Sequence, residues 1–213
     1  MNDIYRVDQS EWLSTKIWGI KWQEYFPAQY DNGITVSPTD FRAVASFMAM
    51  NMEAIYRENS DLSPFLKMSK SDFKRRFYEE AADFFMLSTE GREIGILTAN
   101  PSDWGTYYLR NVSILTEYQN RGVFQPFFVQ LLQILSKHGV ERAEAEVSPS
   151  NLGQVHLLNK LGFNVTGFSV SERFGTLTKF TKYFSHYHEE NFIEQFCFGV
   201  KPQLNSNTER RMV

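Results

Sequence analysis

A short turn at residues 117–124 joins two segments of different pattern, and this junction constrains the fold most. Before it, residues 107–115 are rich in aromatic and branched side chains, which predicts a strand. After it, apolar side chains recur at helical spacing through residues 123–135, which predicts an amphipathic helix packed on a sheet. A strand that passes through a glycine turn into a helix leaves N–H groups unpaired at the positive end of the helix dipole. The junction therefore predicts a phosphate site.

Strands and helices are also predicted on either side of this junction. The expected strands are 34–36, 83–89, 93–99, 107–115, 142–147, 164–171 and 176–184, and the expected helices are 38–57, 70–81, 123–138 and 151–161. The summed order is a strand, two helices, three antiparallel strands, a helix, a strand, a helix and a final hairpin. This order predicts an α/β (α+β) fold with a mixed sheet.

The 213 residues suit one domain with additions at its ends. We expect residues 34–184 to form the domain. Residues 1–33 contain three of the four tryptophans at near-helical spacing and are expected to be a helical extension packed on the domain, or else a lid over a substrate cleft. Residues 185–213 are expected to be an aromatic C-terminal extension that ends in a disordered polar tail.

Composition narrows the classes of partner and compartment. A net charge of −3 gives no reason to expect nucleic acid, and no apolar run of about 18 residues predicts a membrane span. A single cysteine, Cys197, precludes an intramolecular disulfide and suits a reducing compartment. With no secretory signal, a cytoplasmic location is expected. The histidines and glutamates at 186–190 match no zinc spacing, so no metal is expected.

Two segments together resemble a known family. The turn has the form Gln119-x-x-Gly122-x-Phe124, and about twenty-five residues later a second segment places Asn151, Gln154, Leu157, Leu158, Lys160, Gly162 and Phe163 at characteristic positions. The pair is similar to the acyl-CoA loop and following helix of the GCN5-related N-acetyltransferase (GNAT) family, over about residues 83–184. The resemblance implies a GNAT-like fold, with a central mixed, mostly antiparallel sheet flanked by helices and terminal extensions outside it.

The resemblance also implies acetyl-CoA as cosubstrate and a set of residues that bind it. These are Val112, Ser113, Ile114, Gln119, Asn120, Arg121, Gly122, Val123, Phe124 and Asn151. Backbone N–H groups of the turn would hold the pyrophosphate, and main-chain groups at 112–114 would hold pantetheine where two parallel strands separate. Asn151 would contact the same arm or serve as a plain helix N-cap.

Phe124 departs from the family pattern, which has a small residue there. Its ring either blocks the approach of phosphate or rotates into the core. The row formed by Phe124, Phe128 and Leu132 favours the core.

Transfer to an amine requires a base, because an alkyl amine with a pKa near 10.4 is mostly protonated at pH 7. The resemblance places Glu146 as this base, and Glu144 should share its strand face. Tyr108 is an alternative catalytic position that would order substrate or water. A backbone N–H near Ser113 or Ile114 would meet the oxyanion.

The proton donor for the departing thiolate is not identified by sequence. Leu158 occupies the position where the family commonly has a tyrosine. Another donor could take over, from Tyr107, Tyr183, Ser148 or His156. Alternatively the thiolate leaves unaided, or the protein is no longer an enzyme.

The sequence therefore predicts an acyl-CoA-dependent N-acetyltransferase (EC 2.3.1.-). It would acylate a primary amine of a small molecule or peptide by direct transfer in a ternary complex. One alternative is an acyltransferase that uses long-chain acyl-CoA or acyl-carrier protein. The other is a catalytically silent GNAT-like module that binds a ligand or partner. The aromatic termini also allow a homodimer.

Overall fold

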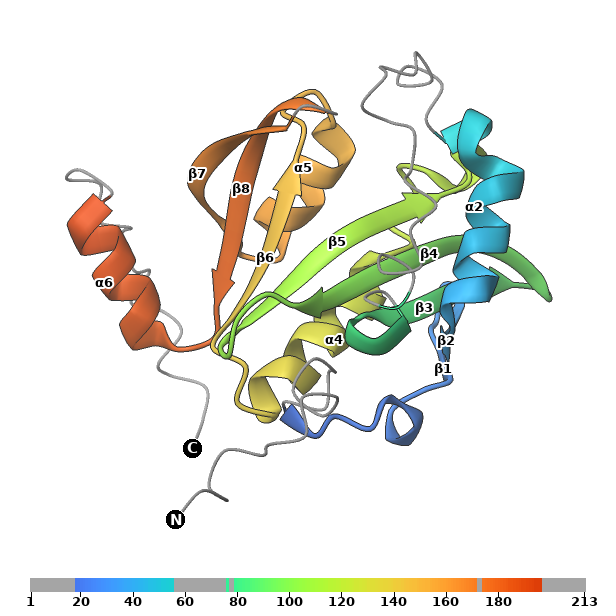
Figure 1. The fold of residues 1–213 in the computed structure, drawn as a ribbon, viewed down its shortest axis with the longest axis horizontal. Coiled ribbons are helices and arrows are strands. Elements are labelled where there is room, and N and C mark those ends of the chain that lie inside the picture. Colours follow the sequence, from blue (N-terminus) through green and yellow to red (C-terminus); the bar gives the residue numbers. More distant parts are fainter. Residues whose placement is uncertain (1–17, 56–75, 77–78, 172–173, 197–213) are drawn as a thin grey trace.

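An eight-stranded sheet forms the centre of the molecule (Figure 1), seen here in a computed structural model that describes residues 18–55, 76, 79–171 and 174–196. The strand order is β1-β2-β3-β4-β5-β6-β8-β7. The strands are β1 Ala28–Gln29, β2 Thr35–Thr39, β3 Asp83–Thr89, β4 Arg92–Pro101, β5 Thr106–Ile114, β6 Arg142–Val147, β7 Asn164–Ser171 and β8 Gly175–Tyr183. Within the described residues, β5 and β6 pair in parallel and every other neighbouring pair is antiparallel. This confirms the predicted mixed, mostly antiparallel sheet.

Helices cover both faces of this sheet. Helix α2 lies on the front face in Figure 1, and α4 and α5 lie behind it. The helices are α2 Phe41–Ile55, α4 Gln125–Lys137, α5 Leu152–Lys160 and α6 His186–Phe196, with 3₁₀-helices at Trp22–Glu24 and Thr116–Tyr118. None of the helices in the described ranges combines the length and apolar composition needed to cross a bilayer.

Helix α4 confirms the prediction from its apolar rows. Phe127, Leu131 and Leu135 are fully buried, and the Phe127 ring packs 5.3 Å from Phe85 of β3, centroid to centroid. The helix begins two residues later than expected, at Gln125, because the turn before it has positive φ values at Asn120 and Gly122, which are not helical. It ends before Gly139, whose φ of +81° suits a glycine C-cap.

The N-terminal segment differs from the helix that its spacing suggested. The described part of residues 1–33 contains 3₁₀ conformation at Trp18 and at Trp22–Glu24, followed by the two-residue strand β1. Trp22 is 6% exposed and its ring lies 5.1 Å from that of Phe85, so packing on the sheet takes precedence over helical periodicity. Pro27 also cannot donate a helical hydrogen bond. Trp12 lies outside the described residues, and the division into domain and extensions stays a prediction.

The last three strands of the sheet pair in a spatial order that the local sequence pattern did not predict. Strand β8 pairs with β6, so the earlier strand β7 becomes the edge of the sheet. Residues 186–196, expected as part of an aromatic tail, form helix α6, which packs against β8 through Tyr183 and Phe192, with ring centroids 5.7 Å apart. Most of the expected helix at 70–81 and all of 197–213, including Cys197, lie outside the described residues.

The feature that positions the site is the short pairing between β5 and β6. Only Thr106–Tyr108 pair with Arg142–Glu144 in the described structure, and beyond this point the two strands diverge (Figure 1). The register of β5 against β4 shifts close by, so that Arg110 is an extra, bulged residue. The sheet thus opens at the C-terminal ends of its two parallel strands.

Candidate active site

The opening between β5 and β6 is bordered by main-chain groups of β5. Leu115 donates its N–H to Ile94 of β4. Main-chain groups alternate in direction along a strand, so Ser113 also faces β4 whereas Val112 and Ile114 face the opening. A Cβ on Gly95 would lie 2.8 Å from the Ser113 carbonyl oxygen, which agrees with this direction. Of the three residues predicted here, Val112 and Ile114 present backbone groups to the opening, and Ser113 does not.

The predicted phosphate turn lies at the wide end of this opening. Asn120 and Gly122 have positive φ values of +59° and +69°, a conformation that brings successive N–H groups to one side. Within the described residues, the amides of Gly122, Val123 and Phe124 donate no hydrogen bond. The Gln119 side chain donates from Nε2 to the Ile114 carbonyl at 3.3 Å, which ties the turn to β5. The turn is therefore formed and has amides available for an anion.

Phe124 does not obstruct this turn. Its ring is 6% exposed and lies 5.6 Å from the Phe128 ring in the core. Val123 is buried likewise, whereas a Cβ built on Gly122 meets no atom within 4 Å. The side chains point inward and the backbone faces open space, which is the arrangement that a bound phosphate requires.

A shallow depression of about 500 Å³ lies between Asn120 of the turn and helix α5. It is lined by Asn120, Leu152, Gly153, Val155, His156 and Asn159. Asn120 reaches across to α5, since a Cβ on Gly153 would lie 3.1 Å from its Oδ1. Asn151 caps α5 by accepting from the Gln154 amide at 3.2 Å. Asn120 of the turn and the exposed side of α5 therefore border one shallow depression.

On the front face of the opening, Tyr108 and Glu146 meet across the two strands. The Tyr108 hydroxyl donates to Glu146 Oε2 at 3.2 Å. Within the described residues, this is the only hydrogen bond or ion pair of the Glu146 carboxylate. The two predicted catalytic residues are therefore in contact, at the point where β5 and β6 separate.

Tyr108 is held as a proton donor. Burial, together with the charge and hydrogen bond of Glu146, raises the pKa of Tyr108 to about 12. The Arg110 guanidinium lies 5.3 Å from the centroid of the Tyr108 ring and donates from Nε to Asn100 Oδ1 at 2.7 Å. The hydroxyl thus keeps its proton at neutral pH and directs it at the carboxylate.

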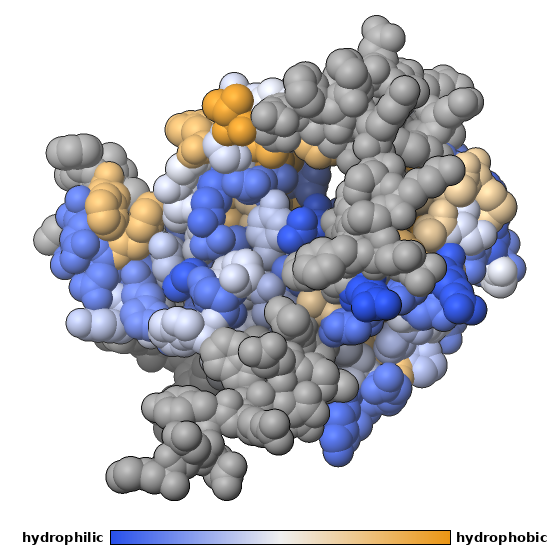
Figure 2. Space-filling view, in the orientation of Figure 1, coloured by the Kyte–Doolittle hydropathy of each residue, from blue (hydrophilic) through white to orange (hydrophobic). Residues whose placement is uncertain are grey.

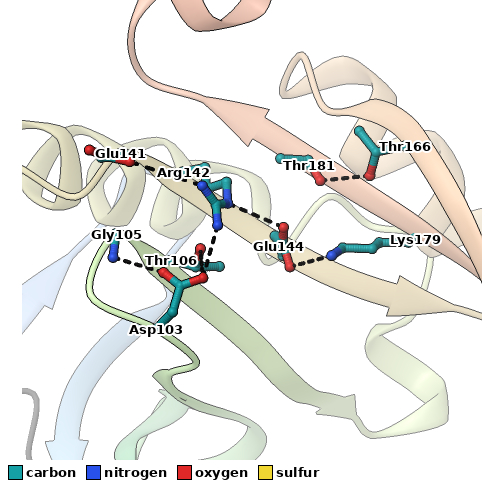
Figure 3. A network of polar contacts seen from close by, with 9 residues as sticks. All are labelled: Asp103, Gly105, Thr106, Glu141, Arg142, Glu144, Thr166, Lys179 and Thr181. Carbon is teal, nitrogen blue, oxygen red and sulfur yellow. Dashed lines mark hydrogen bonds and ion pairs between the residues drawn. The ribbon is translucent and has the colours of Figure 1, made fainter. Parts of the chain in front are cut away.

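Glu144 shares the face of Glu146, as predicted, but belongs to a different set of contacts (Figure 3). Its carboxylate lies 2.8 Å from Lys179 Nζ of β8 and 3.4 Å from Arg142 Nε. Arg142 Nη2 in turn lies 2.9 Å from Asp103 Oδ2. Figure 2 shows hydrophilic side chains gathered at the centre of this face. Glu144 is therefore compensated by cations, and Glu146 contacts a neutral phenol.

The candidate proton donors occupy different parts of the molecule. Leu158 is 2% exposed in the core, and Tyr107 is fully buried and donates to Asp83 Oδ2 at 2.8 Å, so neither faces the opening. Tyr183 lies opposite Arg142, at the far end of β8. Ser148 follows β6 and its hydroxyl lies 2.8 Å from that of Ser150, and His156 lines the depression beside Asn120.

Sequence reasoning missed Arg110 and Lys179 as members of the site. Arg110 is placed by a bulge, and Lys179 by the register of β8 on β6. The alternation of buried and polar residues in 142–147 did indicate that Glu144 and Glu146 share a face. No local pattern indicates which residue of another strand lies opposite them.

A family model described as the acetyltransferase (GNAT) family matches residues 51–163, more than half of the chain. The protein therefore belongs to the GNAT acetyltransferase family. A search of curated protein sequences gives no match.

Solved structures share the fold at low sequence identity. A GNAT family acetyltransferase from Elizabethkingia anophelis with acetyl-CoA bound has a TM-score of 0.51 and 15% identity, with 72% of this chain and 99% of that one covered. The ribosomal-protein-S18-alanine N-acetyltransferase from Escherichia coli has a TM-score of 0.54 and 18% identity, covering 71% and 94%. A variant of the spermidine N-acetyltransferase SpeG from Vibrio cholerae has a TM-score of 0.55 and 16% identity, covering 76% and 99%. These likenesses show the fold.

Proposed function

We propose that the protein is an acetyl-CoA-dependent N-acetyltransferase that transfers the acetyl group directly to a primary amine. The observation that carries this proposal is the open glycine turn on one side of the β5–β6 opening, with the Tyr108–Glu146 pair on the front face. A thioester carrier bound along the opening would place its carbonyl between a phosphate site and a carboxylate. Membership in the GNAT family supports the same activity.

The residues of the opening fit the parts of acetyl-CoA. The amides of Gly122, Val123 and Phe124 would bind the pyrophosphate, with Arg121 adding charge. Main-chain groups of Val112 and Ile114 would pair with the amides of the pantetheine arm, as a neighbouring strand would. Of the two backbone N–H groups that face the opening, that of Val112 lies nearer along β5 to the Tyr108–Glu146 pair than that of Ile114, which is tied to the turn, so the Val112 N–H would stabilise the oxyanion.

Glu146 would act as the base. It takes a proton from the ammonium form of the acceptor, directly or through water, and the amine nitrogen then forms a bond to the carbonyl carbon. The carbon–sulfur bond breaks as the thiolate leaves, and the second proton on nitrogen passes to the thiolate or to water, which gives the neutral amide and the thiol of CoA. Because a thiol has a pKa near 8.5, the thiolate is a fair leaving group without a dedicated acid. Tyr108 would hold the Glu146 carboxylate toward the acceptor.

The acceptor is proposed to be a primary amine on a small molecule or a peptide. The likeness to a spermidine N-acetyltransferase and to a ribosomal-protein-alanine N-acetyltransferase suggests which amines to test. A suitable panel contains spermidine, a peptide with a free N-terminal alanine and a lysine-containing peptide. Release of thiol from acetyl-CoA measures turnover for each member.

Calorimetric titration of acetyl-CoA tests the binding site. Gly122→Trp should abolish binding, because it fills the open space over the turn. Gly139→Trp is the matched control: Gly139 also has a positive φ, +81°, and no atom within 4 Å of a built Cβ. It lies at the other end of α4, about 20 Å away. Binding retained in both variants, or lost in both, would contradict the assignment.

A silent binding module is the rival function. It is favoured by Leu158, which is buried at the position where the family commonly has a tyrosine. Acetyl-CoA binding by the wild type with no turnover of any panel amine would support the rival. Turnover that is lost in Glu146→Gln would support the transferase.

A further inference from the structure

Lys179 lies directly opposite Glu146 but is not paired with it. The register of β6 against β8 places Glu146 across from Lys179, on the same face of the sheet. Cross-strand neighbours of opposite charge ordinarily pair. Here the Lys179 ammonium instead leans along the strand to Glu144 Oε2, at 2.8 Å.

Glu144 is held in place to receive this ammonium. Its side chain is 12% exposed, and its second oxygen lies 3.4 Å from Arg142 Nε. Arg142 is anchored by Asp103, at 2.9 Å, and Asp103 accepts hydrogen bonds from the Gly105 amide and the Thr106 hydroxyl. Burial alone would raise the pKa of Asp103, but these hydrogen bonds and the Arg142 charge lower it overall. The contacts run from the β4–β5 loop to β8 (Figure 3).

An ammonium on Glu146 would oppose the proposed reaction in two ways. It would stabilise the charged carboxylate and make it a weaker base. It would also repel the cationic form of the acceptor. The position of the Lys179 ammonium therefore matters for the basicity of Glu146, its direct cross-strand neighbour.

We propose that Glu144 is a positioning residue that draws the Lys179 ammonium away from Glu146 and so keeps Glu146 available to the acceptor amine. This inference rests on the proposed function of Glu146 as base. The charged or titratable groups around Glu146 on the described strands are Tyr108, which bonds to it, Arg110 over the Tyr108 ring, Glu144 and Arg142 on the same face of β6, and Lys179 of β8. Of these, Lys179 is the one directly across the ladder.

The test compares Glu144→Met with the double variant E144M/K179M. Methionine has a similar volume but neither charge nor acceptor oxygen, so it releases Lys179 to Glu146. Carbon-13 NMR of the side-chain carboxyls, assigned with Glu146→Gln, follows the titration midpoint of Glu146 without any acceptor. We expect the midpoint to fall by about one pH unit in E144M and to return in the double variant. For a panel amine that is turned over, kcat/KM at pH 7 should fall roughly three- to ten-fold in E144M and recover with the midpoint.

Two results would overturn the inference. One is a Glu146 midpoint that does not move in E144M. The other is a lowered midpoint that stays low in E144M/K179M, which would show that losing Glu144 acts on Glu146 without Lys179, through its own charge or through structure. A different result would overturn the proposed base: unchanged kcat/KM across pH in Glu146→Gln. Since the NMR midpoint does not depend on turnover, the two failures are distinguishable.

Discussion

At the residue scale, the contact between Tyr108 and Glu146 concentrates the proposed chemistry in one hydrogen bond. The carboxylate has this one polar partner in the described structure, and the phenol keeps its proton because its pKa is raised to about 12. The pair therefore behaves as a donor and an acceptor of fixed direction over the physiological pH range. Removing this hydrogen bond should therefore lower catalytic activity more than it lowers the free energy of unfolding.

We predict that Tyr108→Phe lowers kcat/KM about ten- to hundred-fold, because a hydrogen bond to a charged group is worth about 1.5–3 kcal/mol. Steady-state kinetics with a turned-over panel amine measure this loss. Tyr183→Phe is the matched control, since Tyr183 is also part-buried with a raised pKa but lies at the far end of β8. Equal losses in the two variants would remove Tyr108 from the site.

Phe124 provides a second prediction at this scale. Its ring packs on Phe128 in the core while its amide faces the turn. Phe124→Leu should therefore lower the free energy of unfolding by about 1 kcal/mol and leave acetyl-CoA affinity unchanged. Urea unfolding and calorimetric titration measure the two quantities. A weakened affinity at unchanged stability would show that the ring contributes to the ligand site.

At the element scale, the start of α5 combines a structural and a proposed binding role in one side chain. Asn151 Oδ1 caps the helix by accepting from the Gln154 amide. Aspartate caps a helix as well as asparagine does but cannot donate, and it adds a negative charge. Asn151→Asp therefore separates the two roles.

We predict that Asn151→Ala lowers stability by about 1 kcal/mol, whereas Asn151→Asp leaves it nearly unchanged and weakens acetyl-CoA binding. Thermal unfolding and calorimetric titration check the pair. If Asn151→Asp binds acetyl-CoA as the wild type does, Asn151 is only a helix cap.

Helices and strands with a regular spacing of apolar residues were predictable from sequence. Strand β6 has the predicted bounds, 142–147, and α5 and the strands of 83–115 agree within two residues, because each has a regular apolar pattern over several residues. The inward turn of Phe124 followed from its spacing with Phe128. Trp22 shows the limit, since tertiary packing on β3 replaced the helix that its spacing indicated.

The site was predictable only where it depends on local sequence. The phosphate turn and the shared face of Glu144 and Glu146 follow from spacing. The Tyr108–Glu146 contact depends on where two strands separate, and the Lys179–Glu144 pair depends on the register of β8. Such long-range pairings are set by the whole sheet and have no local pattern.

At the scale of the whole molecule, buried tyrosines link stability to pH. Burial raises the pKa of Tyr30 to about 12, and burial and the charge of Asp83 raise that of Tyr107 well above its usual value of about 10. A raised folded-state pKa contributes stability that is fully present below pH 10. That contribution is lost as pH rises through the folded value.

We predict that the free energy of unfolding is steady near pH 9 and falls between about pH 10 and 12, as tyrosines of the unfolded chain ionise first. Tyr107→Phe should lower stability at pH 7 by about 1–3 kcal/mol, because the buried Asp83 loses a donor, and should make the alkaline decline shallower. Urea unfolding at several pH values measures both. An alkaline decline of unchanged slope in this variant would show that Tyr107 does not contribute to it.

The brief pairing of β5 with β6 has a mechanical consequence. Three residue pairs join the five-stranded half of the sheet to the three-stranded half. Under a pulling force applied across the strands, this seam should part before any of the longer ladders, because fewer backbone hydrogen bonds share the load. We also expect the two halves of the sheet to tilt about this seam more readily than either half changes its own internal geometry.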